Sequence, residues 1–507
     1  MKPQHKIKNL DELAHVIEAL KADGQKVIHC HGVFDLLHIG HIRYFTQAKE
    51  FGDVLVVTIT PDEYVDKGPH RPAFNEQLRA EAIASLDEVD YVAVNKWPTA
   101  IETLRLLRPT FYVKGEEFKD LHDATGKIHE EVEVAKALGV TVKFAGDIVF
   151  SSTNLINRYL SNLPKDIQRY LQVFRSRYSL EEILKNIERM SQLKVLVIGD
   201  SILDEYQYCN AIGKSSKDPV LAVSYQSGDL FLGGSLAVVN HISSFVQSVG
   251  LVTILGERDS HEAFISKNLA SNVNKFFFYK RNAPTTIKRR IVDGYTFNKL
   301  IEIYVMDDSP LPKSLDQACC ETMQSLIQGY DLVIAADFGH SAISDRMISI
   351  LTTKAPYLTV NTQANAGNRG FHTISKYPRA DLTCLAEHEI RLDARDLQSN
   401  LRALMQPLVQ RMQTRHCIIT NGRRGCLVSG QAESFVKVPS FATSVIDRVG
   451  AGDALFSIAS LASYLDIPEE MMGFMGNVAG TLAVQVIGNK RSINKKDLLK
   501  SITSLLK

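Results

Sequence analysis

Short apolar runs rich in β-branched residues alternate with amphipathic stretches over the first third of the chain. Within the amphipathic stretches the apolar positions recur every three to four residues, which is the period of a helix. Strands that alternate with helices indicate a parallel, doubly wound α/β sheet. The pattern predicts strands over 26–34, 53–61, 90–94, 110–115 and 140–147, with helices such as 41–52 and 75–86 between them.

A second α/β region follows a polar helical stretch that carries no strand signals. Its predicted strands begin at 194–200 and continue at 331–338, 357–363, 416–422 and 425–430. The longer alternating segments 219–227 and 286–307 are typical of an antiparallel flap rather than of a buried parallel core. The predicted organisation is a helical extension, a first α/β domain, a helical linker and a second α/β domain with a small β flap, over 1–22, 23–163, 164–192 and 193–507.

Composition narrows the possible partners and the compartment. The 507 residues carry a net charge of +1, so nothing global attracts the chain to nucleic acid or to an anionic membrane. No apolar run reaches about 18 residues, and the N-terminus lacks the apolar segment of a signal peptide. The seven cysteines include no C-x-x-C pair, which favours reduced thiols and no structural metal. We therefore expect a cytoplasmic protein without nucleic-acid or membrane partners.

The stretch "HGVFDLLHIGH", residues 31–41, combines three histidines with two glycines where a predicted strand passes into a helix. Free backbone N–H groups and the helix dipole make such a junction a phosphate site. His38 and His41 are three residues apart and face the same side of the turn. Two imidazoles there can stabilise the charge that develops when an oxygen attacks a nucleotide's α-phosphate. Asp35 either positions substrate or caps a turn, and His31 has no assigned role.

A second constellation, "DRVGAGDALF", places three small residues and an acid before a predicted helix. The backbone N–H groups of Gly450, Ala451 and Gly452 can converge on one point and form an anion hole. Asp453 at the helix start can take the proton of an alcohol that attacks a γ-phosphate. Upstream, Asp200 and Asp204 in "GDSILDEY" follow a strand and are suited to binding sugar hydroxyls.

The first domain resembles the H-x-G-H nucleotidyltransferases in "HIGH" and "FSSTNLINRYL". It is most similar to the transferase half of the bacterial bifunctional heptose-phosphate kinase/adenylyltransferases, in "GVFDLLHIGHIRYFTQAKEFGD", "KGPHRPAFNEQLR", "YVKGEEF" and "SSTNLI". The resemblance implies catalytic roles for His38 and His41. It also implies nucleotide and phosphate contacts from Gly32, Phe34, Lys67, Arg71, Lys114, Ser151, Ser152 and Thr153.

The second domain resembles the ribokinase-like (PfkB) carbohydrate kinases, and most closely the kinase half of the same heptose enzymes. The motifs in order are "GDSILDEY", "FLGGSLAVVNHI", "TNGRRGCLV" and "GAGD". The resemblance implies that Asp453 is the catalytic base and that Gly450, Ala451 and Gly452 form the anion hole beside it. It implies sugar contacts from Asp200, Asp204, Gly233 and Gly234, and a nucleotide and magnesium side formed by Glu387, Asn421, Gly422 and Gly425.

The sequence also departs from these relatives. Ala237 stands where the family has a sugar-contacting Asn, and Cys384 replaces the Asn of an N-x-x-E stretch that keeps Glu387. The segment 360–372 replaces an Asp-Pro-Lys-like run, and the transferase precedes the kinase, the reverse of the usual order. Lys288, Arg289 and Arg290 in the flap either meet a sugar phosphate or form a solvated face.

Together these features predict a bifunctional enzyme of nucleotide-sugar biosynthesis. It would phosphorylate a sugar, expected to be a heptose phosphate, from ATP and then couple a sugar 1-phosphate to the NMP of ATP or CTP. Both sites would require Mg²⁺ to bridge the phosphates of the nucleotide. The resemblance also implies a homodimer through the kinase flap. The alternatives are a polyol-phosphate cytidylyltransferase with a degenerate kinase half, and a non-catalytic nucleotide-binding protein. A riboflavin kinase/adenylyltransferase does not fit, because its kinase half lacks the GG and GAGD pattern.

Overall fold

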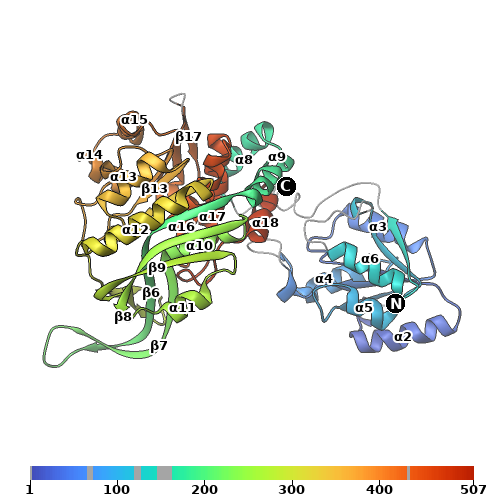
Figure 1. The fold of residues 1–507 in the computed structure, drawn as a ribbon. Helices are drawn as coiled ribbons and strands as arrows, with labels where there is room; N and C mark the ends of the chain where they lie inside the picture. Colours follow the sequence, from blue (N-terminus) through green and yellow to red (C-terminus); the bar gives the residue numbers. More distant parts are fainter. Residues whose placement is uncertain (1–2, 66–71, 119–126, 146–162, 431–433, 507) are drawn as a thin grey trace. The chain divides into compact units, whose positions relative to one another are not determined.

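The computed structural model describes residues 3–65, 72–118, 127–145, 163–430 and 434–506 (Figure 1). The chain folds into two compact units, which divide between residues 162 and 163. None of the described helices is long and apolar enough to cross a membrane. All seven cysteines are buried with free thiols.

The first unit is a five-stranded parallel sheet in the order β3-β2-β1-β4-β5. The central strand β1 is flanked by the next strand in sequence on one side and by β4 on the other, which is the doubly wound arrangement that the alternation predicts. The elements are α1 (Pro3–Lys6), α2 (Leu10–Ala22), β1 (Val27–Gly32), α3 (Ile39–Lys49), β2 (Val54–Ile59), η1 (Asp62–Tyr64), α4 (Glu76–Ala84), β3 (Tyr91–Val94), α5 (Ile101–Leu107), β4 (Phe111–Gly115), η2 (Glu116–Phe118), α6 (Lys127–Ala137) and β5 (Thr141–Ala145).

The N-terminal helix α2 is part of this unit rather than an appendage. Asn9 caps it by accepting a hydrogen bond from Glu12 N at 2.9 Å. Its apolar side chains Leu10, Leu13 and Ile17 are buried in one cluster with Val56 of the sheet. The predicted extension therefore covers one face of the first sheet.

The second unit contains a 12-stranded mixed sheet with helices on its faces. Its central part is parallel, in the order β6-β12-β13-β14-β15, and β16 and β17 continue it in antiparallel fashion. The first elements are α8 (Lys165–Arg177), α9 (Leu180–Arg189), η3 (Met190–Gln192), β6 (Lys194–Lys214), β7 (Leu221–Gly234), α10 (Ser235–Ser243), β8 (Ser248–Arg258), α11 (Glu262–Asn268), β9 (Val273–Pro284), β10 (Thr286–Asp293), β11 (Lys299–Val305) and α12 (Lys313–Leu326). The others are η4 (Ile327–Gly329), β12 (Leu332–Asp337), α13 (Asp345–Lys354), β13 (Leu358–Thr362), η5 (Ile374–Lys376), β14 (Leu382–Ala386), α14 (Glu387–Ala394), α15 (Leu401–Met412), β15 (His416–Thr420), η6 (Gly422–Arg424), β16 (Cys426–Ser429), β17 (Phe435–Val438), α16 (Ala451–Tyr464), α17 (Glu469–Ala483) and α18 (Lys495–Leu506).

The helical segment predicted as a linker packs against the second unit. The ring of Phe174 in α8 stacks on Phe474 of α17 at 4.4 Å between centroids. Arg177 forms an ion pair of 2.8 Å with Glu470. Helices α8 and α9 thus contribute to the core of the second unit instead of forming a free connector.

The flap is built differently from the prediction. Strand β6 runs for 21 residues, so it begins in the parallel core and ends in the β6–β7 hairpin, which extends away from the body of the unit (Figure 1). Strands β10 and β11 are antiparallel to each other, but β10 pairs with β6 in parallel. The flap is therefore a mixed continuation of the main sheet rather than a separate antiparallel sheet.

Candidate functional sites

The predicted phosphate site of the first unit lies where β1 ends and α3 begins. His38 is the N-cap of α3, and its Nδ1 accepts a hydrogen bond from Gly40 N at 3.1 Å. The imidazoles of His38 and His41 stack with their centroids 3.9 Å apart. The two histidines therefore share one turn of backbone, as their spacing predicts.

The chemistry of His38 follows from this cap. Burial lowers the pKa of His38, which favours a neutral ring at pH 7. Because Nδ1 accepts a hydrogen bond, the neutral ring carries its proton on Nε2. A neutral imidazole with Nε2–H is a donor suited to a phosphate oxygen.

Phe34 holds the second histidine in place. Its backbone is left-handed, with φ of +48°, and its buried ring meets the ring of His41 edge-on at 5.4 Å. The same ring packs on Phe45 of α3 at 5.0 Å. Gly32 lies just before this turn. A Cβ at this position would lie 3.0 Å from the Phe34 ring, so the close approach of the ring favours glycine.

His31 and Asp35, in the same stretch, both have contacts inside the first unit. His31 Nδ1 lies 2.8 Å from Thr58 Oγ1 of the neighbouring strand, so it joins β1 to β2. The buried carboxylate of Asp35 accepts a hydrogen bond from Ala73 N. Of the two interpretations of Asp35, these contacts favour the one in which it fixes a turn.

Lys114 lies in a buried polar cluster. Its ammonium is 2.8 Å from Glu131, which also accepts hydrogen bonds from the Tyr112 hydroxyl at 2.8 Å and from Ala100 N at 2.9 Å. Burial opposes ionisation of Glu131, but the charge of Lys114 and the hydrogen bonds hold its pKa at about 2. Lys114 therefore has a carboxylate partner before any phosphate binds, and its role as a phosphate clamp stays a prediction. The sequence interpretation did not include Glu131, which occurs in an ordinary amphipathic helix.

The other predicted transferase residues, Lys67, Arg71, Ser151, Ser152 and Thr153, lie outside the described residues.

The predicted base of the second unit lies at the start of α16. Gly450 is the N-cap with φ of +83°, and a Cβ there would lie 2.1 Å from Asn489 Oδ1, so only glycine fits. Ala451, Gly452 and Asp453 form the first turn of α16. Burial and the nearby charge of Asp204 raise the pKa of Asp453 to about 7, and Lys288 opposes the shift. Asp453 is therefore poised to take up a proton near neutral pH.

Asp204 faces this base from strand β6. Its carboxylate lies against Gly233, where a Cβ would come within 2.3 Å of Oδ2. Arg290 of β10 binds Asp204 and also pairs with Glu302 at 2.7 Å. The paired glycines 233 and 234 thus allow the end of β7 to approach the middle of β6 closely enough to bring this carboxylate to the start of α10.

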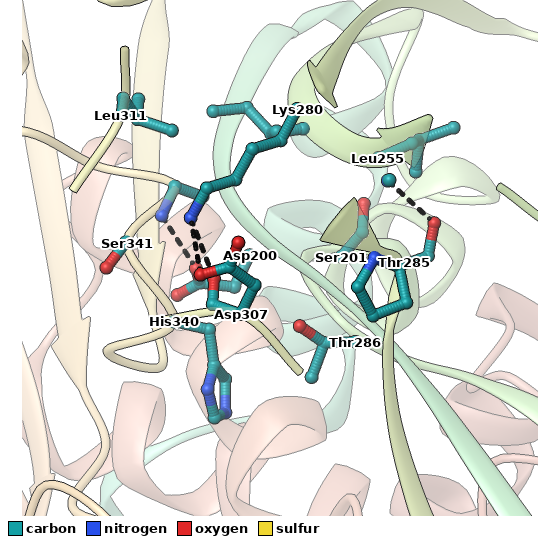
Figure 2. A pocket seen from close by; sticks show the side chains of 14 residues that line it. Asp200, Ser201, Leu255, Lys280, Thr285, Thr286, Asp307, Leu311, His340 and Ser341 are labelled. Carbon is teal, nitrogen blue, oxygen red and sulfur yellow. Dashed lines mark hydrogen bonds and ion pairs between the residues drawn. The ribbon is translucent and has the colours of Figure 1, made fainter. Parts of the chain in front are cut away.

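Asp200, which was predicted to contact the sugar, is almost fully buried. Its two carboxylate oxygens accept hydrogen bonds from Phe338 N at 2.7 Å and Ala342 N at 3.0 Å. It lines a small cavity of about 30 Å³ together with Lys280 and His340 (Figure 2). That volume holds about one water molecule. These contacts tie β6 to the loop after β12, so the geometry favours Asp204 rather than Asp200 for direct contact with a sugar.

The predicted nucleotide and magnesium side lies around the loops that follow β14 and β15. Glu387 pairs with Arg391 at 2.8 Å and with Arg424 at 2.9 Å. Asn421 N donates to Gly425 O at 2.7 Å and so closes the turn that contains Gly422. Glu387, Asn421 and Arg424 line a pocket of about 560 Å³. A further carboxyl group, that of Glu389 in α14, was not among the predicted residues, and burial raises its pKa to about 7.

The two substituted positions are both buried. Ala237 lies in α10 beside a pocket of about 290 Å³ that Asn240 and Asn489 also line. Cys384 lies in β14, and burial raises the pKa of its thiol, so it is an inert core residue.

Comparison with known proteins assigns a family to each of the two domains. The pattern of the pfkB family carbohydrate kinases matches residues 192–496, and that of the cytidylyltransferase-like family matches residues 29–159. The chain belongs to the pfkB family of carbohydrate kinases. Its transferase-like domain precedes the kinase domain. The predicted fold class and the two enzyme families are confirmed.

Curated relatives align with the chain over one segment of about 160 residues. The bifunctional protein HldE of Geobacter metallireducens is 39% identical over 158 residues, which are 31% of each chain. That of Geotalea uraniireducens is 42% identical over 164 residues, which are 32% of each chain. The chain thus spans about a third of the length of these relatives.

Among solved structures, the kinase unit resembles phosphofructokinase-2 from Escherichia coli. The structure in complex with potassium has a TM-score of 0.51 and 16% identity, covering 63% of this chain and 100% of the other. The structure with substrates and products has a TM-score of 0.52, also at 16% identity, covering 62% of this chain and 100% of the other. At this identity the likeness establishes the fold alone.

Proposed function

We propose that the chain is a bifunctional enzyme that makes a nucleotide-activated sugar. The kinase half phosphorylates a sugar phosphate, a heptose phosphate in the simplest case, from ATP. The transferase half couples a sugar 1-phosphate to the NMP of ATP or CTP and releases pyrophosphate. The observation that carries the proposal is the presence, in one chain, of the stacked His38–His41 pair and of Asp453 at a helix start.

In the transferase step, an oxygen of the sugar 1-phosphate attacks the α-phosphorus and the bond to the β-phosphate oxygen breaks. Charge grows on the α-phosphate oxygens and on the departing pyrophosphate. Imidazole N–H groups and the free amides at the start of α3 stabilise this charge. No protein nucleophile is required, which agrees with the absence of one from the predicted set.

In the kinase step, Asp453 takes the proton of the sugar hydroxyl that attacks the γ-phosphorus. The amides of Gly450, Ala451 and Gly452 stabilise the phosphoryl oxygens, and Asp204 orients the sugar. Both units would use nucleotides with Mg²⁺, which neutralises phosphate charge when bound. Among the described residues no three acidic, histidine or cysteine side chains gather into a metal cage. We expect the ion to be held mainly by the phosphates, with Glu387 as a nearby carboxylate.

The decisive experiment is a screen of the purified chain against ATP, CTP, GTP and UTP with a panel of sugar and polyol phosphates, with products identified by mass. The proposal expects a phosphorylated sugar and an NDP-sugar. A chain that transfers NMP to a polyol phosphate, and no γ-phosphate to any sugar, would instead be a transferase with an inactive kinase half. The substitutions at Ala237 and Cys384 favour that alternative, and the intact Asp453 site opposes it.

The kinase activity should depend on pH through Asp453. A carboxylate with a pKa of about 7 is mostly protonated at pH 6 and cannot accept a proton from the alcohol. We expect kcat/KM for the sugar to rise about tenfold from pH 6 to pH 8, with its midpoint near 7. Initial rates across this range measure it, and a profile that is flat down to pH 5 would contradict the assignment of Asp453 as base.

We propose further that the chain forms a homodimer through its flap. Strand β11 is an edge strand, and on the face of the flap opposite Lys288 it exposes Ile301 and Ile303 to 56% and 42%. An apolar edge strand is stabilised by pairing with another sheet. Sedimentation should give twice the chain mass of 56.5 kDa, and Ile301→Lys should yield monomers. A monomeric wild type at micromolar concentration would rule the dimer out.

A cytoplasmic location fits this function, because nucleotides are abundant there and the seven buried cysteines are free thiols.

A further inference from the structure

Lys288 is a buried cation in the kinase site that has no hydrogen-bond or ion-pair partner among the described residues. It lies in β10, and only 6% of it is exposed. Its register partners are Asp204 of β6 and Tyr304 of β11, so the three side chains share one face of the flap. The ammonium lies 5.6 Å from the centre of the Tyr304 ring. Within the described part of the chain it forms no hydrogen bond or ion pair.

The two neighbouring cations, Arg289 and Arg290, both form ion pairs with carboxylates. Arg290 binds Asp204 and Glu302 on the same face as Lys288. Arg289 points to the opposite face and pairs with Glu205 at 2.8 Å. The three cations of the "KRR" run therefore differ in their environment. Lys288 faces the site and has no ion-pair partner among the described residues, Arg290 orients Asp204, and Arg289 lies on the outer face.

The carboxylates that act on Lys288 identify what it faces. Burial lowers the pKa of Lys288, and the charge of Arg290 acts in the same direction, whereas the charges of Asp204, Asp200 and Asp453 oppose the shift. Asp204 is already bound to Arg290, and both oxygens of Asp200 accept backbone hydrogen bonds. Asp453 is the remaining carboxylate, and it is the base of the reaction. A buried ammonium without a hydrogen-bond partner is costly in free energy, and an incoming anion relieves that cost.

We propose that Lys288 contacts the phosphoryl group in transfer, beside the hydroxyl that Asp453 deprotonates. The inference rests on the proposed kinase function and adds a catalytic residue to it. In this step the hydroxyl proton passes to Asp453 and a bond forms between the sugar oxygen and the γ-phosphorus. The bond from that phosphorus to the β–γ bridging oxygen breaks, and ADP leaves with the electron pair. As Asp453 becomes neutral, the charge of Lys288 is balanced by the equatorial oxygens of the phosphoryl group.

The test compares Lys288→Met, Lys288→Arg and Arg289→Met in the full-length chain, with ATP and the sugar phosphate that the wild type accepts. Methionine keeps the length of the side chain and removes its charge. We expect Lys288→Met to lower kcat about 10²–10³-fold with KM for the sugar phosphate changed by less than about threefold. Lys288→Arg should retain part of the activity, because it restores a cation. Arg289→Met should keep kcat within about threefold, because Arg289 lies on the outer face.

The melting temperature of each variant reports whether the kinase unit is folded, and pyrophosphate release by the transferase half shows that equal amounts of active chain are compared. A folded Lys288→Met with wild-type kcat would overturn the proposal. A KM that rises tenfold or more at unchanged kcat would overturn it as well, because Lys288 would then bind the sugar's own phosphate. If the wild type transfers no γ-phosphate to any sugar, the proposed kinase function itself fails, which is a different result from active wild type with active Lys288→Met.

Discussion

Replacing His41 with alanine should lower nucleotidyl transfer on the order of 10³-fold and leave sugar phosphorylation within about twofold. The ring of His41 is held between the His38 ring at 3.9 Å and the edge of Phe34 at 5.4 Å. Alanine removes an imidazole donor and also the surface against which His38 stacks, so both members of the pair lose their position. Pyrophosphate release measures the first activity and ADP formation with a sugar phosphate the second.

The matched control is His129→Ala, since His129 is exposed on α6 of the same unit. This variant should keep both activities. Parallel loss of pyrophosphate release and of phosphorylation in His41→Ala, with both retained in His129→Ala, would argue against two separate sites.

Replacing Asp453 with asparagine should have the converse effect. The amide is isosteric but cannot accept the hydroxyl proton, so kcat of the kinase should fall about 10²–10⁴-fold. Nucleotidyl transfer should be unchanged, because Asp453 lies in α16 of the second unit. The stability of the variant should not decrease, since a neutral side chain at a position that raises a carboxyl pKa to about 7 avoids the burial of a charge.

Asp466→Asn provides the control for this variant. Asp466 follows α16, is exposed and has φ of +54°, a conformation that asparagine tolerates. Full kinase activity in Asp453→Asn would remove the carboxylate from the reaction and leave the anion hole as the main source of catalysis.

Periodicity was sufficient for most of the elements. The five strands of the first unit and the strands β12, β13, β15 and β16 lie where short β-branched runs predict them. Strands β8, β9, β14 and β17 were not predicted, and of these β8 and β9 extend the sheet in parallel beyond β6. In β9 the run "FFFYKRN" mixes aromatic and basic residues, and short runs of that kind do not distinguish a strand from a buried turn of helix.

The functional motifs were also recognisable from the sequence. "HIGH" and "GAGD" each occupy one turn at the start of a helix, and the backbone conformation of that turn, including the φ of +83° at Gly450, is set within a few residues. The predicted places of His38, His41 and Asp453 therefore required no knowledge of distant segments. The roles of residues with distant partners could not be assigned from the sequence. Asp200 and Asp204 look equivalent in "GDSILDEY", and only their partners in other strands and loops distinguish them.

The pairing of the charged side chains follows from the tertiary structure. Arg290 reaches Asp204 across 86 positions of sequence, and Glu131 of α6 reaches Lys114 of the strand β4. Register along β6 and β10 places Lys288 and Arg290 on the site face and Arg289 on the outer face. Turn geometry and periodicity are local, so the two folds and the two helix-start motifs could be predicted from the amino-acid sequence alone. Strand register and burial arise from contacts between distant segments, and they determine which of several similar charged residues faces the reaction.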